Sequence, residues 1–173
     1  MRLDIEAVNV KHYNKKPCHD CPFRKDIPKY QTTDDTRRNL EQIYNPFGLP
    51  VCHHTATSLG KEGPEHACAG ALILVQKTGL KKLWVDRNGP LELELTADIY
   101  DDLYEFATTS ACPNQSFKAR FAAWIECQPE HTRPEWRKKL KEIIERHGLH
   151  EALPTRHQRM RHNQELYDIG GSD

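Results

Sequence analysis

Four of the six cysteines have the spacing of a metal centre. Cys18 and Cys21 form a Cys-x2-Cys pair, Cys52 follows after 30 intervening residues, and Cys68 follows after 15 more. A Cys-x2-Cys pair places two thiolates on one tight turn, and two thiolates from separate loops complete a set of four ligands. Because these cysteines stand beside turns, prolines and histidines, we predict that they bind a metal rather than fill a core.

The sequence leaves the kind of metal open. Zinc favours tetrahedra that are usually built from two close-spaced ligand pairs, whereas only one close pair is present here. The proline that directly follows Cys21 is familiar from iron–sulfur ligand loops. Thiolates suit both metals, and the spacing favours a [4Fe-4S] cluster slightly over Zn²⁺. Either would tie distant parts of the chain together and stabilise the fold.

These motifs resemble two known families. The spacing of the four cysteines is similar to that of the cluster ligands in family-4 uracil-DNA glycosylases, although that family's catalytic motifs are missing. Cys18-x2-Cys21-Pro-Phe-Arg, then Cys52-His53 and then Cys68-Ala-Gly also resemble a small, functionally uncharacterised family of phage and actinobacterial proteins, over about residues 16–72. Phe23 stands where that family is expected to have an aromatic residue, often Trp. The resemblance implies that the cysteines act as a unit and that the chain is phage-encoded, and it implies no activity.

Histidines and two further cysteines flank this constellation. His53 directly follows Cys52, so we predict that it supports the centre as a donor to a sulfur. Replacement of a cysteine as ligand and a role as an acid/base group stay open for the histidines beside the cysteines. Adjacent residues on a strand point to opposite faces, so at most one of His53 and His54 is expected to face the centre. Cys112 and Cys127 have no partner at ligand spacing, and we expect both to be small buried side chains.

The elements that must position these residues are predicted to be mostly helices. Capping residues and apolar periodicity predict helices over 33–44, 68–76, 96–106, 116–125 and 132–148, and strands over 51–55 and 91–95. The fold class is therefore mainly α with a small β component, and the loop-rich N-terminal third is organised around the four-cysteine metal centre. We expect residues 1–154 to form a single metal-centred globular domain and 155–173 to form a basic polar tail, helical or mobile.

The formal net charge of zero hides a segregation of charge. Residues 11–38 carry eight basic and four acidic side chains, residues 131–162 carry nine and four, and residues 86–105 carry seven acidic and one basic. Basic stretches with arginines are suited to phosphates or to an acidic partner. The candidate residues for contact with nucleic acid or a protein partner are Arg24, Lys25, Arg156, Arg159 and Arg161.

Composition excludes several classes of protein. The 173 residues make about one domain, and Leu, Ile, Val and Phe account for about one residue in five, which predicts a thin hydrophobic core. No run of about 18 apolar residues is present, and the first residues lack the pattern of a signal peptide. Clustered cysteines without an export signal favour a reducing compartment, so we expect a cytoplasmic protein, in the host cytoplasm if it is phage-encoded.

No catalytic signature is present: there is no P-loop, no Rossmann fingerprint and no His-Glu-x-x-His. The sequence therefore predicts a small metal- or iron–sulfur-binding accessory protein that binds nucleic acid or a host protein. Two alternatives stay open. One is an iron–sulfur enzyme in redox chemistry or nucleic-acid processing, and the other is an inhibitor whose acidic segment 92–105 mimics nucleic acid, which would require an exposed and unpaired acidic face.

Overall fold

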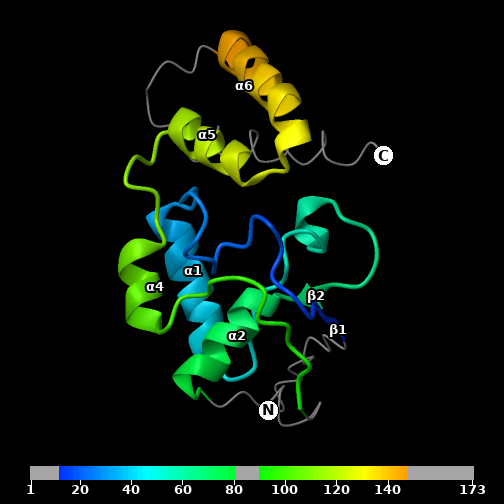
Figure 1. The fold of residues 1–173 in the computed structure, drawn as a ribbon, viewed down its shortest axis with the longest axis vertical. Coiled ribbons are helices and arrows are strands. Elements are labelled where there is room, and N and C mark those ends of the chain that lie inside the picture. The colour runs from blue at the N-terminus through cyan, green and yellow to red at the C-terminus, as the bar shows by residue number, and fades with distance from the viewer. Residues whose placement is uncertain (1–11, 81–89, 148–173) are drawn as a thin grey trace, which may run out of the picture.

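The computed structural model describes residues 12–80 and 90–147, and this part of the chain is mainly helical (Figure 1). Its helices are α1 (Thr33–Tyr44), α2 (Ala69–Thr78), α4 (Leu103–Thr109), α5 (Phe117–Cys127) and α6 (Arg133–His147), with short 3-10 turns at Thr57–Leu59 and Glu130–Thr132. Strands β1 (His12–Tyr13) and β2 (His66–Ala67) pair in parallel. The prediction of a mainly α fold with a small β component is confirmed.

Within the described residues, no helix combines the length and the apolar character needed to cross a membrane. The predicted tail, residues 155–173, lies outside the described part of the chain, as do residues 148–154 of the predicted domain.

Capping residues explain where the helices begin. Thr32 precedes α1 and accepts a hydrogen bond from the Asp35 N–H, while the Asp35 carboxylate accepts one from the Thr32 N–H. Such reciprocal bonds satisfy two N–H groups that a helix start leaves unpaired. Asp102 caps α4 and Ser116 caps α5, each with a side-chain oxygen that accepts a hydrogen bond from the backbone N–H three residues later. The helices predicted over 33–44, 68–76 and 116–125 are confirmed to within two residues.

The strand predicted over 51–55 is wrong. Val51 makes a single bridge to Ala67, but the chain then turns, because the Thr55 N–H donates to the Cys52 carbonyl at 2.8 Å. The Cys52 N–H itself donates to the His66 carbonyl at 2.8 Å, which anchors the turn beside β2. The expected alternation of His53 and His54 to opposite faces is therefore lost.

The expectations for residues 91–106 are also corrected. Leu91 and Leu93 pack against the buried core, as their alternation predicts, but this segment forms no strand ladder. Its backbone is instead held by single bonds, such as that from the Glu94 N–H to the Lys15 carbonyl at 2.7 Å. The helix predicted from Thr96 begins only at Leu103, since Ile99 bridges to Arg24 in extended conformation and Asp102 provides the cap.

Helix α2 is the centre of the main core. Its residues 69–75 are all buried, as their nearly continuous apolar character predicts. Phe23, from the loop that carries the first cysteine pair, packs here and stacks on Phe106 with ring centroids 4.9 Å apart. The loop between Cys18 and Gln31 is therefore anchored to the core by its own side chains.

Helices α5 and α6 form a hairpin with a smaller core of its own. Phe117, Phe121, Ile125 and Ile143 are buried between the two helices. In Figure 1 this hairpin lies at one end of the molecule, and helices α1, α2 and α4 lie at the other. The loop with the first cysteine pair runs between them, so it can contact both cores.

Candidate metal centre

The four predicted ligand cysteines come together from three segments. The turn that carries Cys18 and Cys21 is closed by a 3.2 Å hydrogen bond from the Cys21 N–H to the Cys18 carbonyl. Cys52 begins the turn at 52–55, and Cys68 is the N-cap residue of α2. The Cys18 sulfur interacts with the sulfurs of Cys21 and Cys52, and the Cys21 and Cys68 sulfurs lie 3.7 Å apart. The four sulfurs therefore form one connected group.

Backbone groups favour the thiolate at two of these sulfurs. The backbone of His54 acts to lower the pKa of Cys52, and the backbone of Ala71 acts to lower the pKa of Cys68. Because Cys68 caps α2, its sulfur also lies at the positive end of the helix dipole, which favours a thiolate. Backbone groups of this kind stabilise sulfur ligands of metals.

Contacts among the sulfurs separate the pKa values of the four thiols. Hydrogen bonds from Cys21 and then Cys52 lower the pKa of Cys18 against the effect of burial, and a bond from Cys21 lowers the pKa of Cys68. The same contacts, together with burial, raise the pKa of Cys21 and of Cys52. Without a metal, two thiols thus stabilise two thiolates, and a bound cation would replace the protons on the thiols.

Gly70 allows α2 to approach the sulfurs. A Cβ atom at this position would lie 2.4 Å from the Cys21 Sγ and 3.0 Å from the Phe23 Cβ. The first distance is far inside van der Waals contact, so a side chain here would displace the sulfur or the helix. The close packing of α2 on the centre therefore requires glycine at this position.

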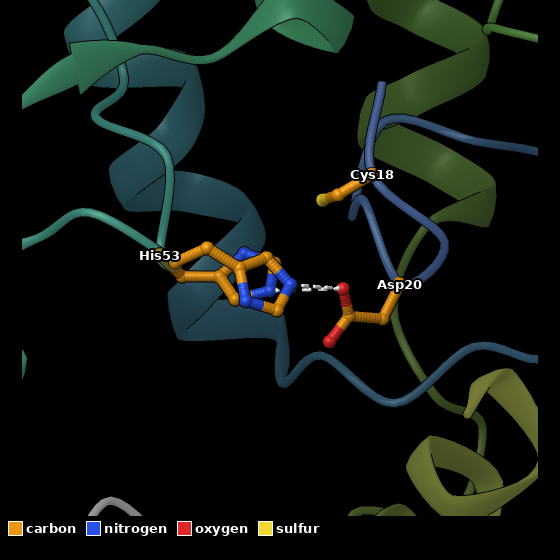
Figure 2. Close-up of side chains that lie close together, drawn as sticks. Cys18, Asp20 and His53 are labelled. Atoms are coloured by element: carbon orange, nitrogen blue, oxygen red, sulfur yellow. Dashed lines mark hydrogen bonds and ion pairs between the residues drawn. The ribbon is translucent and has the colours of Figure 1, made fainter. Parts of the chain in front are cut away.

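A second group of ligand-type side chains lies beside the sulfurs. The Nε2 atoms of His53 and His54 lie 3.1 and 2.8 Å from the same carboxylate oxygen, Oδ1 of Asp20. Figure 2 shows Asp20 and His53 pointing toward one another, with Cys18 on the same loop as Asp20. The donor atoms of Cys18, Asp20, His53 and His54 all lie within 4.8 Å of one another, which is the spacing of a candidate metal site.

Asp20 is held in place by the α5–α6 hairpin. Its side chain is 1% exposed, and its second oxygen, Oδ2, accepts hydrogen bonds from Trp124 Nε1 at 3.1 Å and from Gln128 Nε2 at 3.4 Å. The Tyr30 hydroxyl donates to the Asp20 backbone carbonyl. A buried carboxylate is tolerated only when it is paired in this way, so the contacts of Asp20 couple the cysteine loop to α5.

The Asp20 contacts shift the pKa values of the group. Burial alone would raise the pKa of Asp20, but the contacts with His53 and His54 outweigh it and hold this pKa below its ordinary value. The hydrogen bond to Asp20, followed by the contact with Cys18, raises the pKa of His54 to about 10. The negative charge of Asp20 therefore favours a positive charge on the histidines, and the same negative charge would attract a metal cation.

Sequence reasoning named His53 and expected at most one of His53 and His54 to face the centre, whereas both lie against Asp20; it missed Asp20, Trp124 and Gln128. Asp20 lies inside the Cys-x2-Cys pair, so its place in a metal loop was a usable signal. Its contacts with Trp124 and Gln128 span more than 100 residues, and no local pattern indicates them. Both histidines reach Asp20 because residues 52–55 form a turn. The predicted supporting role of His53 toward the sulfurs stays a prediction.

Two of the residues predicted to contact a partner, both in the basic loop, bind other groups of the same chain. Arg24 donates to both carboxylate oxygens of Asp26, at 2.9 and 2.7 Å, and to the Cys18 carbonyl at 3.2 Å. Lys25 pairs with Asp101 at 2.6 Å. These contacts favour a structural role for Arg24 and Lys25 over a role in partner binding. The other three candidates, Arg156, Arg159 and Arg161, lie outside the described residues.

The acidic segment 92–105 is partly neutralised by lysines from elsewhere in the fold. Asp101 pairs with Lys77 at 2.8 Å as well as with Lys25, and Glu92 pairs with Lys15 at 2.7 Å. A nucleic-acid mimic would need this face unpaired, so these ion pairs weigh against that alternative.

Cys112 and Cys127 are buried, as expected. Their thiols donate to backbone carbonyls, Cys112 to Asn114 at 2.8 Å and Cys127 to Ala123 at 3.4 Å. Burial, followed by the charge of Asp20, raises the pKa of Cys127 to about 12. A thiol held neutral in this way is a poor metal ligand and a poor nucleophile.

Comparison of the chain with protein-family models, with curated proteins and with solved structures finds no match.

Proposed function

We propose that this chain binds one Zn²⁺ through Cys18, Cys21, Cys52 and Cys68, and that it acts as an accessory binding protein. The 3.7 Å separation of the Cys21 and Cys68 sulfurs carries the proposal. A zinc–sulfur bond of about 2.3 Å gives a tetrahedron whose sulfurs lie about 3.8 Å apart. In a [4Fe-4S] cluster each thiolate binds a different iron atom, so its ligand sulfurs stand farther apart. The distance thus favours zinc, against the slight preference of the sequence.

A structural role follows from the ligand set. Four thiolates close the coordination sphere and leave no position for a substrate. The ligands come from three segments that share little regular structure, and a metal that joins them contributes its binding free energy to folding. A chain with few large apolar residues gains little free energy of folding from its core, so a contribution from metal binding matters more to its stability.

The C-terminal region is the proposed contact with nucleic acid. The basic residues of α6 are partly neutralised by neighbours on the helix, as in the pair of Lys139 with Glu135 at 2.8 Å. No acidic residue lies between Glu151 and Glu165, a stretch that contains Arg156, Arg159 and Arg161. Arginines without nearby carboxylates suit phosphates best, and an acidic host protein is the competing partner.

Metal analysis tests the first half of the proposal. After anaerobic purification, we expect a colourless protein with at least one tightly held zinc and no acid-labile sulfide. Cys52→Ser should lose the zinc and much of the thermal stability, whereas Cys112→Ser should keep the zinc. A brown protein that contains iron and sulfide would contradict zinc, and a Cys52→Ser variant with full zinc content and stability would contradict the four-cysteine centre.

Salt dependence tests the second half. We expect the affinity for DNA or RNA to fall steeply as the salt concentration rises, because bound arginines release counterions from the phosphates. Replacing Arg156, Arg159 and Arg161 by glutamine should weaken binding and reduce the slope of log affinity against log salt. Arg37→Gln, in an exposed pair with Glu41, serves as the control. An affinity that is independent of salt would exclude the phosphate contact.

A further inference from the structure

We propose that Asp20, His53 and His54 form a second metal site, which holds a divalent transition-metal ion and keeps a coordination position open to a cavity. The site itself rests on the geometry of these three side chains. The expected total of two ions per chain also rests on the four-cysteine zinc centre proposed above.

The three donor atoms already converge. His53 Nε2 and His54 Nε2 lie 3.1 and 2.8 Å from Asp20 Oδ1, and the two imidazole centroids are 4.3 Å apart. Metal bonds of about 2.0–2.1 Å to nitrogen and oxygen place tetrahedral ligands about 3.3 Å from one another. Shifts of a few tenths of an ångström therefore admit an ion. Two imidazoles with one carboxylate are a ligand set for zinc and for non-haem iron.

In the part of the chain that the structure describes, the His53 ring nitrogen Nε2 lacks a hydrogen-bond partner, which such an ion would replace. This nitrogen is buried, and although it faces Asp20 Oδ1 it makes no hydrogen bond of acceptable geometry within the described residues. A buried polar nitrogen without a partner costs free energy. An ion between the imidazole nitrogens and the carboxylate would satisfy it.

The surroundings of Asp20 are those of a metal ligand. Trp124 and Gln128 both bind its Oδ2, at 3.1 and 3.4 Å, and leave Oδ1 to the histidines. A ligating carboxylate is commonly oriented in this way, with one oxygen on the metal and the other held by neighbouring donors. These contacts come from α5, which carries none of the four clustered cysteines.

The three residues line a cavity of about 520 Å³, whose walls also include Arg120 and Trp124. Three protein ligands leave at least one position on a zinc-like ion, and the cavity provides room for a ligand there. A cation beside an arginine selects water or an anionic oxygen, such as a carboxylate or phosphate. The Cys18 sulfur lies within 4.8 Å of these donors, so the two ions would be neighbours.

Cobalt titration of the reduced, metal-free full chain tests the proposal, since Co²⁺ bound by thiolates absorbs much more strongly than Co²⁺ bound by nitrogen and oxygen. The first equivalent should produce intense thiolate bands, and a second should bind with only weak additional absorption. Replacing His53 and His54 together by alanine should abolish the second equivalent and keep the first. His54→Gln provides a milder variant in case the double variant does not fold, and His66→Gln is the control that keeps both.

The outcomes separate this proposal from the four-cysteine centre. One equivalent in the unaltered chain, with thiolate bands that the histidine variants leave unchanged, would overturn the second site alone. Two equivalents in a folded double-histidine variant would overturn it as well. One equivalent that is lost in the histidine variants and kept in Cys68→Ser would overturn both, because a single mixed site at Cys18, Asp20, His53 and His54 would then account for all the metal.

Discussion

At the scale of single residues, Gly70 sets the distance between helix α2 and the Cys21 sulfur. Any side chain at this position would meet the sulfur at 2.4 Å. We expect Gly70→Ala to destabilise the fold by about 2 kcal/mol or more, because overpacking of a buried contact forces backbone shifts, and to weaken zinc binding. Thermal unfolding and a competition assay with a chelator measure the two effects.

Gly60→Ala is the matched control for this substitution. Gly60 has a φ of 75°, so alanine is strained there, but nothing lies within 4 Å of the added methyl group. It should lower stability slightly and leave zinc affinity unchanged. Equal zinc affinities of the Gly70→Ala variant and the unaltered chain would show that α2 does not pack closely against a metal centre.

The two groups of cysteines should differ in reactivity. With zinc bound, none of the six thiols should react readily with iodoacetamide. After chelation at pH 8, Cys18 and Cys68 should react first, because their pKa values are lowered, whereas Cys127 should react slowly, because burial raises its pKa to about 12. Peptide mass spectrometry measures the order in which the cysteines are alkylated. Rapid alkylation of Cys127 in the folded, zinc-loaded chain would contradict its assignment as a buried, neutral thiol.

Single residues also show which parts of the candidate site could be predicted from the sequence. The spacing of the four cysteines predicted that they lie together, and the structure links the Cys18 sulfur to those of Cys21 and Cys52 and the Cys21 sulfur to that of Cys68. That they bind a metal stays a prediction. Asp20 was missed, because its burial depends on Trp124 and Gln128, which lie more than 100 residues away. Donors supplied by a distant helix leave no trace in local residue patterns.

At the scale of elements, the turn at residues 52–55 is the main departure from the predicted organisation. A strand would have separated the His53 and His54 side chains, whereas the turn presents both to Asp20. The helix expected from Thr96 begins only after Asp102, whereas the start of α5 was predictable, because its cap, Ser116, acts through neighbouring backbone. The short segment 51–55 was not, because its conformation is fixed by long-range bonds to β2.

Helix α5 should stabilise the cysteine loop through one indole group. Trp124→Phe removes the hydrogen bond to Asp20 Oδ2 and leaves a buried carboxylate with one donor fewer. We expect a loss of about 2 kcal/mol, the size typical of a lost bond to a charged group, measured by denaturant unfolding of the zinc-loaded chain.

Trp136→Phe is the control, since Trp136 packs edge to face on Trp124 in the same aromatic cluster, and the donors to Asp20 Oδ2 in the described residues are Trp124 and Gln128. A similar loss in both variants would mean that ring packing, and not the bond to Asp20, couples α5 to the loop.

At the scale of the whole molecule, two small cores are joined through the cysteine loop. The main core surrounds α2, the second lies between α5 and α6, and Asp20 connects the loop to the second. The thin core that the composition predicts is thus divided further. The proposed metal centre would join three segments and offset this division, because its binding free energy would contribute directly to folding.

Hydrogen exchange should reveal this division. We expect removal of zinc to lower amide protection more in α2, whose N-cap residue Cys68 is a proposed ligand, than in α6, which packs mainly on α5. Exchange followed by mass spectrometry on the zinc-loaded and chelated chain measures both. Unchanged protection of α2 after complete loss of zinc would show that the centre does not support the core.

X-ray absorption at the zinc edge shows whether one ion is bound by the four sulfurs. The full chain is loaded with one equivalent of zinc, so that the tightest site alone is occupied. We predict a shell of four sulfur atoms at about 2.3 Å. A shell that contains nitrogen or oxygen from Asp20, His53 or His54 in place of sulfur would contradict it.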